Sequence, residues 1–383
     1  MRAIVQVPLR PLEAASWAHS VVPGARYDLS PGFASQRRDD DDEHPALAWD
    51  EAESSLVHAV ADRYNVETSQ VALCPGAGQA VVQALIAMLR PGDHVVVERP
   101  SYEPLFRVPE MLGASVARID RRIEDGWQLV PERLAKVLTP RTRAVVLTNL
   151  HSPSGVACSP RTLAEIAGLA ARVGAALLVD EVLLDFAFDL DPAAPCRPAC
   201  TVADNAISFS STSKGFGLPE LRVGWLVTRD PDLARGLRIA ADYLHTRLPA
   251  ATARLAAHAV RHADDFIPRA NRLASAGRRV VERWAQGEPR VEWIPPHAGM
   301  HTVVRLPVGV NDLAFAAHLR ARYETQVIPG SVLEAPQCVR LGFAAPTQVL
   351  EQGLANFSAA LDDLLGGAAP DRPPAHNDPQ DAA

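Results

Sequence analysis

Lysine is scarce in this chain: only Lys136 and Lys214 occur among 383 residues, although lysine and arginine together number 38. Plentiful alanine and arginine, with little asparagine, indicate that the bias reflects codon usage in a GC-rich genome. The setting of Lys214 is more informative, because it ends the small, hydroxyl-rich run Ser211-Thr212-Ser213-Lys214. Arginine cannot replace a lysine whose amine must lose its proton and form a Schiff base. The context of Lys214 therefore indicates amine chemistry.

Cysteine is also infrequent. The five cysteines, at positions 74, 158, 196, 200 and 338, show no CxxC spacing. Cys196 and Cys200 are the closest pair, but they lie in a proline-rich stretch without a matching histidine or cysteine cluster. This usage excludes a disulfide framework and argues against a metal site, so we expect free thiols in a reducing compartment.

Long apolar runs, a basic stripe and an N-terminal basic-then-apolar segment are missing. We therefore expect no membrane span and no secretory signal, and we predict a cytoplasmic protein. The net charge is −7, which argues against a nucleic-acid partner. With 48% hydrophobic and 22% charged residues, the composition is typical of a globular protein with a large core.

Short apolar runs alternate with helical patterns along the first two thirds of the chain. We expect strands at 95–97, 144–147, 176–179 and 206–209, and helices at 49–64, 79–89, 159–173 and 232–245. Ser159-Pro160 is a typical helix start, with an N-cap followed by a first-turn proline. This alternation predicts an α/β fold with an open, mostly parallel sheet covered by helices. Ligands bind such sheets beyond the carboxyl ends of the strands.

The pattern changes near residue 265, where a long Arg-rich helix precedes strand-like pieces at 300–306 and 338–343 and a final helix at 347–365. We therefore predict a large α/β domain over 49–264 and a smaller α+β domain over 265–366. Residues 1–48 would form an N-terminal arm or part of the small domain, with an exposed charged loop at 36–43. Residues 367–383 are expected to be disordered.

Three polar features fall where such a sheet places ligands. Gly76, Ala77 and Gly78 follow an expected strand and open a helix, so their amides can hold a phosphate, or simply form a tight turn. Asp180 ends an apolar run and could pair with a ligand cation or cap a helix. Tyr102 could be an aromatic platform or core filling.

A fourth feature carries the most weight. Ser211 precedes Lys214 by three residues, and Arg222 follows it by eight in Lys214-Gly-Phe-Gly-Leu-Pro-Glu-Leu-Arg222-Val-Gly224. A hydroxyl and a guanidinium at these positions can converge on one phosphate while the amine meets an aldehyde beside it.

Taken in this order, these features resemble the class I/II aminotransferases, fold-type-I enzymes that use pyridoxal 5′-phosphate. The resemblance covers about residues 45–365, and the Ser-x-Ser-Lys-x-x-Gly…Arg-x-Gly signature is its most specific part. It implies a Lys214 Schiff base, a catalytic lysine that carries the proton at Cα, and a phosphate held by Ser211 and Arg222 with the amides of 76–78. Asp180 would pair with the pyridine nitrogen, and Tyr102 would stack on the ring.

The resemblance also implies a substrate and a partner. Arg340, in Val339-Arg340-Leu341-Gly342-Phe343, matches the late family arginine that binds the α-carboxylate of an amino acid or keto acid. Its alternative is a surface arginine on a strand. A homodimer is implied, because this family builds its active site between two subunits. His245 and Arg247 lie where a partner often reaches the substrate, although helix-end surface residues explain them too.

The sequence departs from the family around one cofactor atom. The family loop Asn-Pro-x-Asn-Pro-Thr/Ser-Gly reads Asn149-Leu-His151-Ser152-Pro-Ser-Gly155, so the asparagine that donates to the phenolic oxygen is Ser152. The tyrosine of Asp-x-x-Tyr, which contacts the same oxygen, is Leu183. We expect altered acidity of the Schiff-base proton, unless Asn149 or His151 compensates. The partner-reaching tyrosine also lacks a clear counterpart near 47–49, and Glu220 replaces a common glycine.

Amino transfer is the leading hypothesis, but the lysine signature does not separate it from elimination, cyclisation or oxidation. The run from Lys214 to Trp225 and the triplet Asp242-Tyr243-Leu244 are similar to those of antibiotic-pathway members of the family, which also lack the Asp-x-x-Tyr tyrosine. A non-catalytic sensor would need a DNA-binding domain, for which the acidic stretch before the fold is too short. A Rossmann dehydrogenase would need a different glycine spacing.

Overall fold

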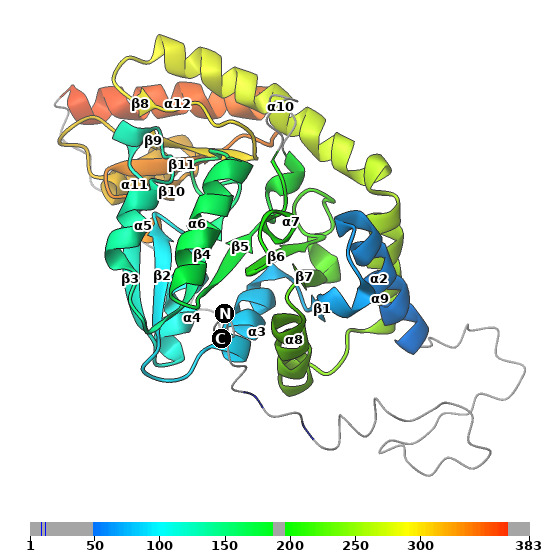
Figure 1. The fold of residues 1–383 in the computed structure, drawn as a ribbon. Coiled ribbons are helices and arrows are strands. Elements are labelled where there is room, and N and C mark those ends of the chain that lie inside the picture. The colour runs from blue at the N-terminus through cyan, green and yellow to red at the C-terminus, as the bar shows by residue number, and fades with distance from the viewer. Residues whose placement is uncertain (1–8, 10–11, 13–48, 187–195, 367–383) are drawn as a thin grey trace, which may run out of the picture.

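The computed structural model describes residues 9, 12, 49–186 and 196–366. The predicted arm, the charged loop at 36–43 and the tail at 367–383 therefore lie almost entirely outside the described residues. The described chain forms a seven-stranded sheet and a four-stranded sheet (Figure 1). No helix within these ranges is long and apolar enough to cross a membrane.

The large sheet has the strand order β1-β7-β6-β5-β4-β2-β3. Strands β2 to β6 pair in parallel, whereas β7 is antiparallel to both β1 and β6. The strands are β1 (Val71–Cys74), β2 (His94–Arg99), β3 (Ser115–Asp120), β4 (Thr142–Thr148), β5 (Ala176–Asp180), β6 (Ala206–Ser211) and β7 (Gly224–Thr228). This arrangement confirms the predicted mostly parallel sheet.

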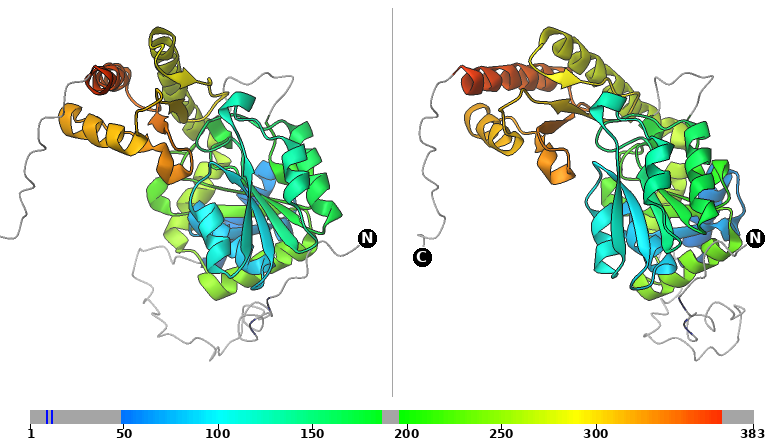
Figure 2. Two further views of the ribbon diagram at one scale, coloured as in Figure 1. Left: turned by 90° about the vertical axis from the view of Figure 1, so that its left-hand side faces the viewer. Right: turned by 60° about the vertical axis from the view of Figure 1, so that its left-hand side comes forward.

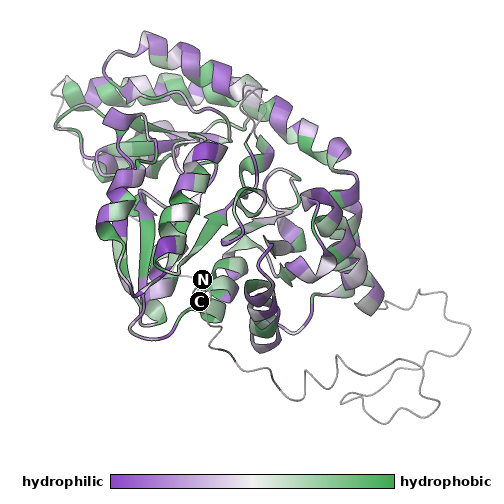
Figure 3. Ribbon diagram, viewed as in Figure 1, coloured by the Kyte–Doolittle hydropathy of each residue, from purple (hydrophilic) through white to green (hydrophobic). Residues whose placement is uncertain are grey.

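Both faces of this sheet are covered, which explains why the central strands are apolar throughout instead of alternating. Helices α3 (Ala77–Met88), α4 (Pro104–Met111) and α8 (Pro231–Leu244) pack on one face. Helices α5 (Pro131–Val137), α6 (Pro160–Arg172) and α7 (Ala199–Val202) pack on the other. Figure 2 shows both layers edge-on, and Figure 3 colours the enclosed strands as hydrophobic.

A third cluster lies at the β1 edge of the sheet, where α2 (Trp49–Tyr64) and α9 (Ala250–Arg261) pack against each other and against β1 and β7. Short 3-10 turns connect several elements, at Thr68–Gln70, Ile123–Asp125, Leu184–Phe186, Pro219–Leu221 and Gly330–Leu333. As the Ser159-Pro160 pair predicted, the Ser159 side chain caps α6 by accepting from Thr162 N at 3.0 Å.

The small sheet is antiparallel, with the order β10-β11-β9-β8. Its strands are β8 (Glu292–Trp293), β9 (His301–Arg305), β10 (Ile328–Pro329) and β11 (Cys338–Gly342). Helices α10 (Ala263–Gly287), α11 (Asp312–Tyr323) and α12 (Thr347–Leu365) share one core with it. In Figure 1, α10 starts beside α9 and runs on beside α12, so one helix spans both parts.

Several elements were not predicted from the sequence. They are β3, β7, β8, β10, α4, α5, α7, α9 and α11. Strand β3 lies at the sheet edge and is mostly half-buried, so its sequence is not a continuous apolar run. Helix α5 has only seven residues, too few for a clear helical period.

Candidate active site

A cavity of about 570 Å³ lies where the carboxyl ends of β4, β5 and β6 meet the small sheet. All predicted site residues except Gly76 line it, and they come from both parts of the fold. The lining includes Ala77, Gly78, Tyr102, Ser152, Asp180, Ser211, Lys214, Arg222 and Arg340. This is the position expected for a ligand of an open α/β sheet.

The candidate phosphate cradle joins the start of α3 to the turn after β6. Gly76 has φ +84°, and a Cβ there would lie 2.7 Å from a guanidinium nitrogen of Arg222. The Arg222 side chain thus occupies the space that the glycine leaves free. Ser211 lies on the same side, at the buried end of β6. A helix N-terminus, a hydroxyl and a guanidinium form a donor set that fits a phosphate dianion.

Gly224 explains the last residue of the Arg-x-Gly signature. It pairs with Cys74 on β1 and with Ser211 on β6, so β7 runs between two close neighbours. A Cβ at Gly224 would lie 2.9 Å from both the Gly76 carbonyl carbon and the Ser210 oxygen. Because Gly224 has no side chain, the turn at Gly76 and the end of β6 can both lie close to β7.

Asp180 and Glu181 follow each other at the end of β5 but face opposite ways. Asp180 lines the cavity, and its Oδ1 accepts from Val182 N at 3.0 Å. Glu181 points away and accepts from Ala199 N at 2.6 Å. Burial raises the pKa of Asp180 to about 7. A buried carboxyl that costs free energy when ionised is suited to a cationic partner, such as a protonated pyridine nitrogen.

Lys214 lies in a turn whose two ends are held by backbone hydrogen bonds. Thr212 N donates to Val223 O at 3.1 Å, and Leu218 N donates to Thr212 O at 3.0 Å. The turn itself closes through Gly217 N, which donates to Lys214 O at 3.0 Å. These bonds point the lysine into the same cavity as Asp180 and Ser211.

Arg340 enters the cavity from β11 of the small sheet. Within the described part of the chain, its guanidinium has no ion pair and no hydrogen bond, although burial lowers its pKa. The Lys214 amine likewise has no hydrogen bond and no ion pair there, although its charge acts on the nearby Asp180 carboxyl. Together with Arg222, these cations outnumber Asp180, so the cavity favours a ligand with more than one anionic group.

The departures from the family pattern meet in the same cavity. Ser152 and Leu183 both line it, as the sequence match predicted. Asn149 and His151, the two suggested compensating groups, do not. Asn149 Oδ1 accepts from Cys158 N at 3.0 Å, and His151 is buried between Ser154 Oγ and Pro100 O. Both ring nitrogens of His151 are thus engaged within the loop, so His151 is not free to compensate. Asn149 Nδ2 is buried and has no hydrogen-bond partner among the described residues, so compensation by Asn149 stays a prediction.

His301 is a titratable residue of the lining that the sequence did not reveal. It starts β9, lines the cavity, and places Nε2 3.4 Å from Ser152 Oγ. Burial, helped by Arg340 and Lys214, lowers its pKa to about 3, so the imidazole is neutral. A lone histidine in an expected strand gives no signal of its own. Only the fold brings it to the lysine turn.

His245 and Arg247 lie elsewhere. Both line a separate hollow near α2 and β1, together with Glu53 and Arg238, and neither lines the Lys214 cavity. Their position supports the helix-end interpretation for the single chain. In the described ranges, no cluster of histidine, cysteine and acidic side chains could hold a metal ion. All five cysteines are free thiols.

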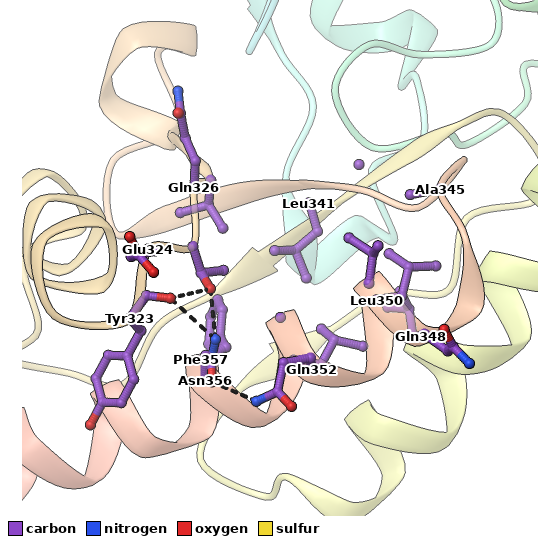
Figure 4. Close-up of a pocket in the computed structure, with 17 residues that line it drawn as sticks. Tyr323, Glu324, Gln326, Leu341, Ala345, Gln348, Leu350, Gln352, Asn356 and Phe357 are labelled. Atoms are coloured by element: carbon purple, nitrogen blue, oxygen red, sulfur yellow. Dashed lines mark hydrogen bonds between the residues drawn. The ribbon is translucent and has the colours of Figure 1, made fainter.

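A second hollow of about 670 Å³ lies within the small domain, between the end of α11, β11 and α12 (Figure 4). Its polar side chains bond mainly to one another: Asn356 Nδ2 donates to Thr325 Oγ1 at 2.8 Å, and Gln352 Nε2 donates to Asn356 Oδ1 at 2.9 Å. Gln326, Val327 and Gly342 line both this hollow and the Lys214 cavity.

Known proteins of similar sequence and structure give these features a context. The family model for aminotransferase class I and II matches residues 50–356. Capreomycidine synthase of Streptomyces vinaceus is 35% identical over 287 residues, covering 75% of this chain and 73% of that protein. An arginine–pyruvate transaminase of Pseudomonas aeruginosa is 29% identical over 311 residues, with 79% and 77% covered.

Solved structures agree. A PLP-dependent aminotransferase from Streptococcus suis has a TM-score of 0.77 at 27% identity, with 82% of this chain and 83% of that chain covered. The PLP-dependent cyclase OrfR has a TM-score of 0.73 at 29% identity, with 84% and 88% covered. The cradle, the Asp180 carboxyl and Lys214 all suit pyridoxal phosphate, the cofactor of these proteins. The chain therefore belongs to the class I and II aminotransferases, with the fold and cofactor of that family.

Proposed function

We propose that the protein acts on an α-amino acid through pyridoxal phosphate bound in the Lys214 cavity, and that it transfers the amino group to a keto acid. The arrangement of charges carries this proposal. Three cationic side chains and one buried carboxyl line the cavity, at positions that suit one phosphate, one carboxylate and one protonated pyridine. When bound, the cofactor serves as an electron sink for the electrons left at the substrate Cα.

Each residue has a defined task in this proposal. Arg222, Ser211 and the amides at 76–78 would hold the phosphate. Asp180 would keep a proton on the pyridine nitrogen by giving it an ionic partner. Tyr102, which is 46% exposed at the cavity, would cover one ring face.

Arg340 and Lys214 Nζ would act on the substrate, the first by binding it and the second by moving its proton. Arg340 would bind the α-carboxylate and so fix the direction of the Cα–H bond. The Lys214 amine would bind the cofactor aldehyde covalently and, once the substrate amine displaced it, would take the proton from Cα.

A second candidate is elimination or cyclisation of the amino acid. It is favoured by the replacement of both phenolic-oxygen donors with Ser152 and Leu183, and by the similarity to capreomycidine synthase and the cyclase OrfR. Amino transfer, elimination and cyclisation all begin with removal of the Cα proton. The same residues would therefore serve the first steps of each reaction.

One experiment separates the candidates. The purified protein is loaded with pyridoxal phosphate and mixed with single amino acids in the absence of oxygen. Conversion to the pyridoxamine form with release of a keto acid supports amino transfer. Ammonia, or a cyclised product without pyridoxamine, supports the second candidate. Failure to bind the cofactor, or a Lys214→Ala variant that still binds it covalently, refutes both.

We also propose a homodimer in the cytoplasm. The family resemblance supports the dimer, and the five free thiols are compatible with a reducing compartment. Light scattering on the purified protein tests the dimer.

A further inference from the structure

We propose that His301 is a positioning residue for the cofactor's phenolic oxygen: its Nε2–H donates to Ser152 Oγ and turns the Ser152 hydroxyl hydrogen toward that oxygen. This inference rests on the proposed cofactor site and deepens it. Serine is shorter than the family asparagine and its hydroxyl rotates freely, so a second group is needed to aim it.

The small sheet presents His301 to Ser152 directly. His301 pairs with Gly342 on β11, while Arg340, two residues earlier on that strand, pairs with Val303. Paired residues on antiparallel strands share a face, so His301 and Arg340 both point toward the large domain. Since Gly342 carries no side chain, nothing opposite His301 blocks its imidazole.

Hydrogen bonds of backbone N–H groups hold both Ser152 and the segment before His301 in place. Ser152 N donates to Thr148 Oγ1 at 2.9 Å. The segment before His301 is tied to the same loop, because His297 N and Ala298 N both donate to Gly155 O, at 3.1 and 3.3 Å. The 3.4 Å separation of Ser152 Oγ and His301 Nε2 is therefore set by two anchored segments.

The charge state of His301 suits a donor. The charged and titratable groups that line the cavity with it are Lys214, Arg222, Arg340, Asp180 and Tyr102. Burial and the nearby cations keep the imidazole neutral, with its pKa at about 3. A neutral imidazole carries one N–H, and donation to Ser152 leaves the Ser152 hydrogen free to donate onward. Within the described residues, Ser152 Oγ is the one hydrogen-bond partner of the His301 ring.

The consequence is measurable in the visible spectrum. A donor at the phenolic oxygen stabilises its negative charge and so weakens its hold on the neighbouring imine proton. Removing the donor raises the pH at which the Lys214-bound cofactor loses that proton and changes colour. A hydrogen bond to a charged group corresponds to about one to two pH units of such a shift.

The test is a pH titration of the absorbance of the cofactor-loaded protein. Ser152→Ala and His301→Phe should each raise the midpoint by about one to two units, and the double variant should shift it no further, because the two residues act in series. His301→Gln keeps a donor and should stay closer to the wild type. Ser152→Asn restores the family donor and should make the midpoint insensitive to His301→Phe.

The outcomes separate the claims. A midpoint that moves with Ser152→Ala but not with His301→Phe overturns the role of His301. A midpoint that moves with neither overturns both roles while leaving cofactor binding intact. If His301 only braces the loop, His301→Phe lowers the melting temperature and leaves the midpoint unchanged. A wild-type protein without any cofactor absorbance overturns the proposed function itself, and this inference with it.

Discussion

Arg121 Nε donates to Glu98 Oε2 at 2.7 Å, and neither side chain has any exposed surface. The other carboxylate oxygen of Glu98 accepts from Thr148 N and Thr148 Oγ1, both at 2.6 Å. Thr148 Oγ1 in turn accepts from Ser152 N. A buried ion pair thus anchors the loop that carries the candidate cofactor contact.

Removal of either partner should destabilise the fold. Arg121→Met leaves the Glu98 carboxylate buried without its cation, which costs about 3–5 kcal/mol in the free energy of unfolding. The double variant Glu98→Leu, Arg121→Met should lose less than the two single losses added together. Urea unfolding measures all three. Arg235→Ala, which breaks the exposed Arg235–Asp232 pair, is the control and should change little. Equal losses for both pairs would contradict this account.

Gly76→Ala should weaken pyridoxal phosphate binding. The added Cβ strains a residue at φ +84° and pushes the Arg222 guanidinium out of the phosphate cradle. We expect the dissociation constant to rise by at least about tenfold, as for the loss of one charge-assisted hydrogen bond. Gly168→Ala is the control, since Gly168 lies on α6 outside the cavity and its Cβ would meet no protein atom within 4 Å. Fluorescence titration with the cofactor compares the two, and similar affinities would argue against the cradle.

Arg340→Gln should reduce kcat/KM for amino acids by about a hundredfold, because a bidentate contact to the carboxylate is lost. Cofactor binding should stay near the wild-type value, since the phosphate is held by the other end of the cavity. Arg305→Gln serves as the control. Arg305 lies on β9, two residues beyond the Val303 that pairs with Arg340, and its ion pairs with Glu124 and Glu292 are outside the cavity. If amines lacking a carboxylate lost as much rate as amino acids, carboxylate binding by Arg340 would be refuted.

Asp180→Asn should stabilise the cofactor-free protein above pH 7. Burial raises the folded-state pKa of Asp180 to about 7, whereas an unfolded chain releases this proton near pH 4. The folded state therefore binds more protons over this range, and the free energy of unfolding falls as the pH rises from about 4 to about 7. The amide removes that loss.

Thermal unfolding at pH 4 and pH 8 checks this expectation. The variant should melt several degrees above the wild type at pH 8 and close to it at pH 4. It should also bind pyridoxal phosphate more weakly, because the pyridine nitrogen loses its ionic partner. Equal melting temperatures at pH 8 would mean that the buried carboxyl carries no such cost.

The chemistry that lies within one turn could be predicted from the sequence. Ser211, Lys214 and Arg222 are close along the chain, so their spacing alone indicates convergence. Asp180 could be placed at the end of a strand because it closes an apolar run, and the family resemblance then assigned it to the pyridine nitrogen.

Contacts between distant segments could not be predicted. His301 lies 149 residues beyond Ser152, and their approach depends on how the small sheet packs against the large one. Strand β7 was missed for a related reason. It is antiparallel to its neighbours in a mostly parallel sheet, and it fits between β1 and β6 because Gly224 has no side chain that would collide with the backbone of Gly76 and Ser210. His151 misled because a polar residue in a site loop can serve the loop instead of the ligand.

The wall formed by Gln326, Val327 and Gly342 has a consequence for changing the specificity of this protein. Leu350 and Gln352 line the small-domain hollow together with that wall, and they do not line the Lys214 cavity. Larger or smaller residues there would shift the wall and reshape the space for a substrate side chain. Libraries directed at the hollow would therefore vary substrate choice while every residue facing the cofactor kept its identity.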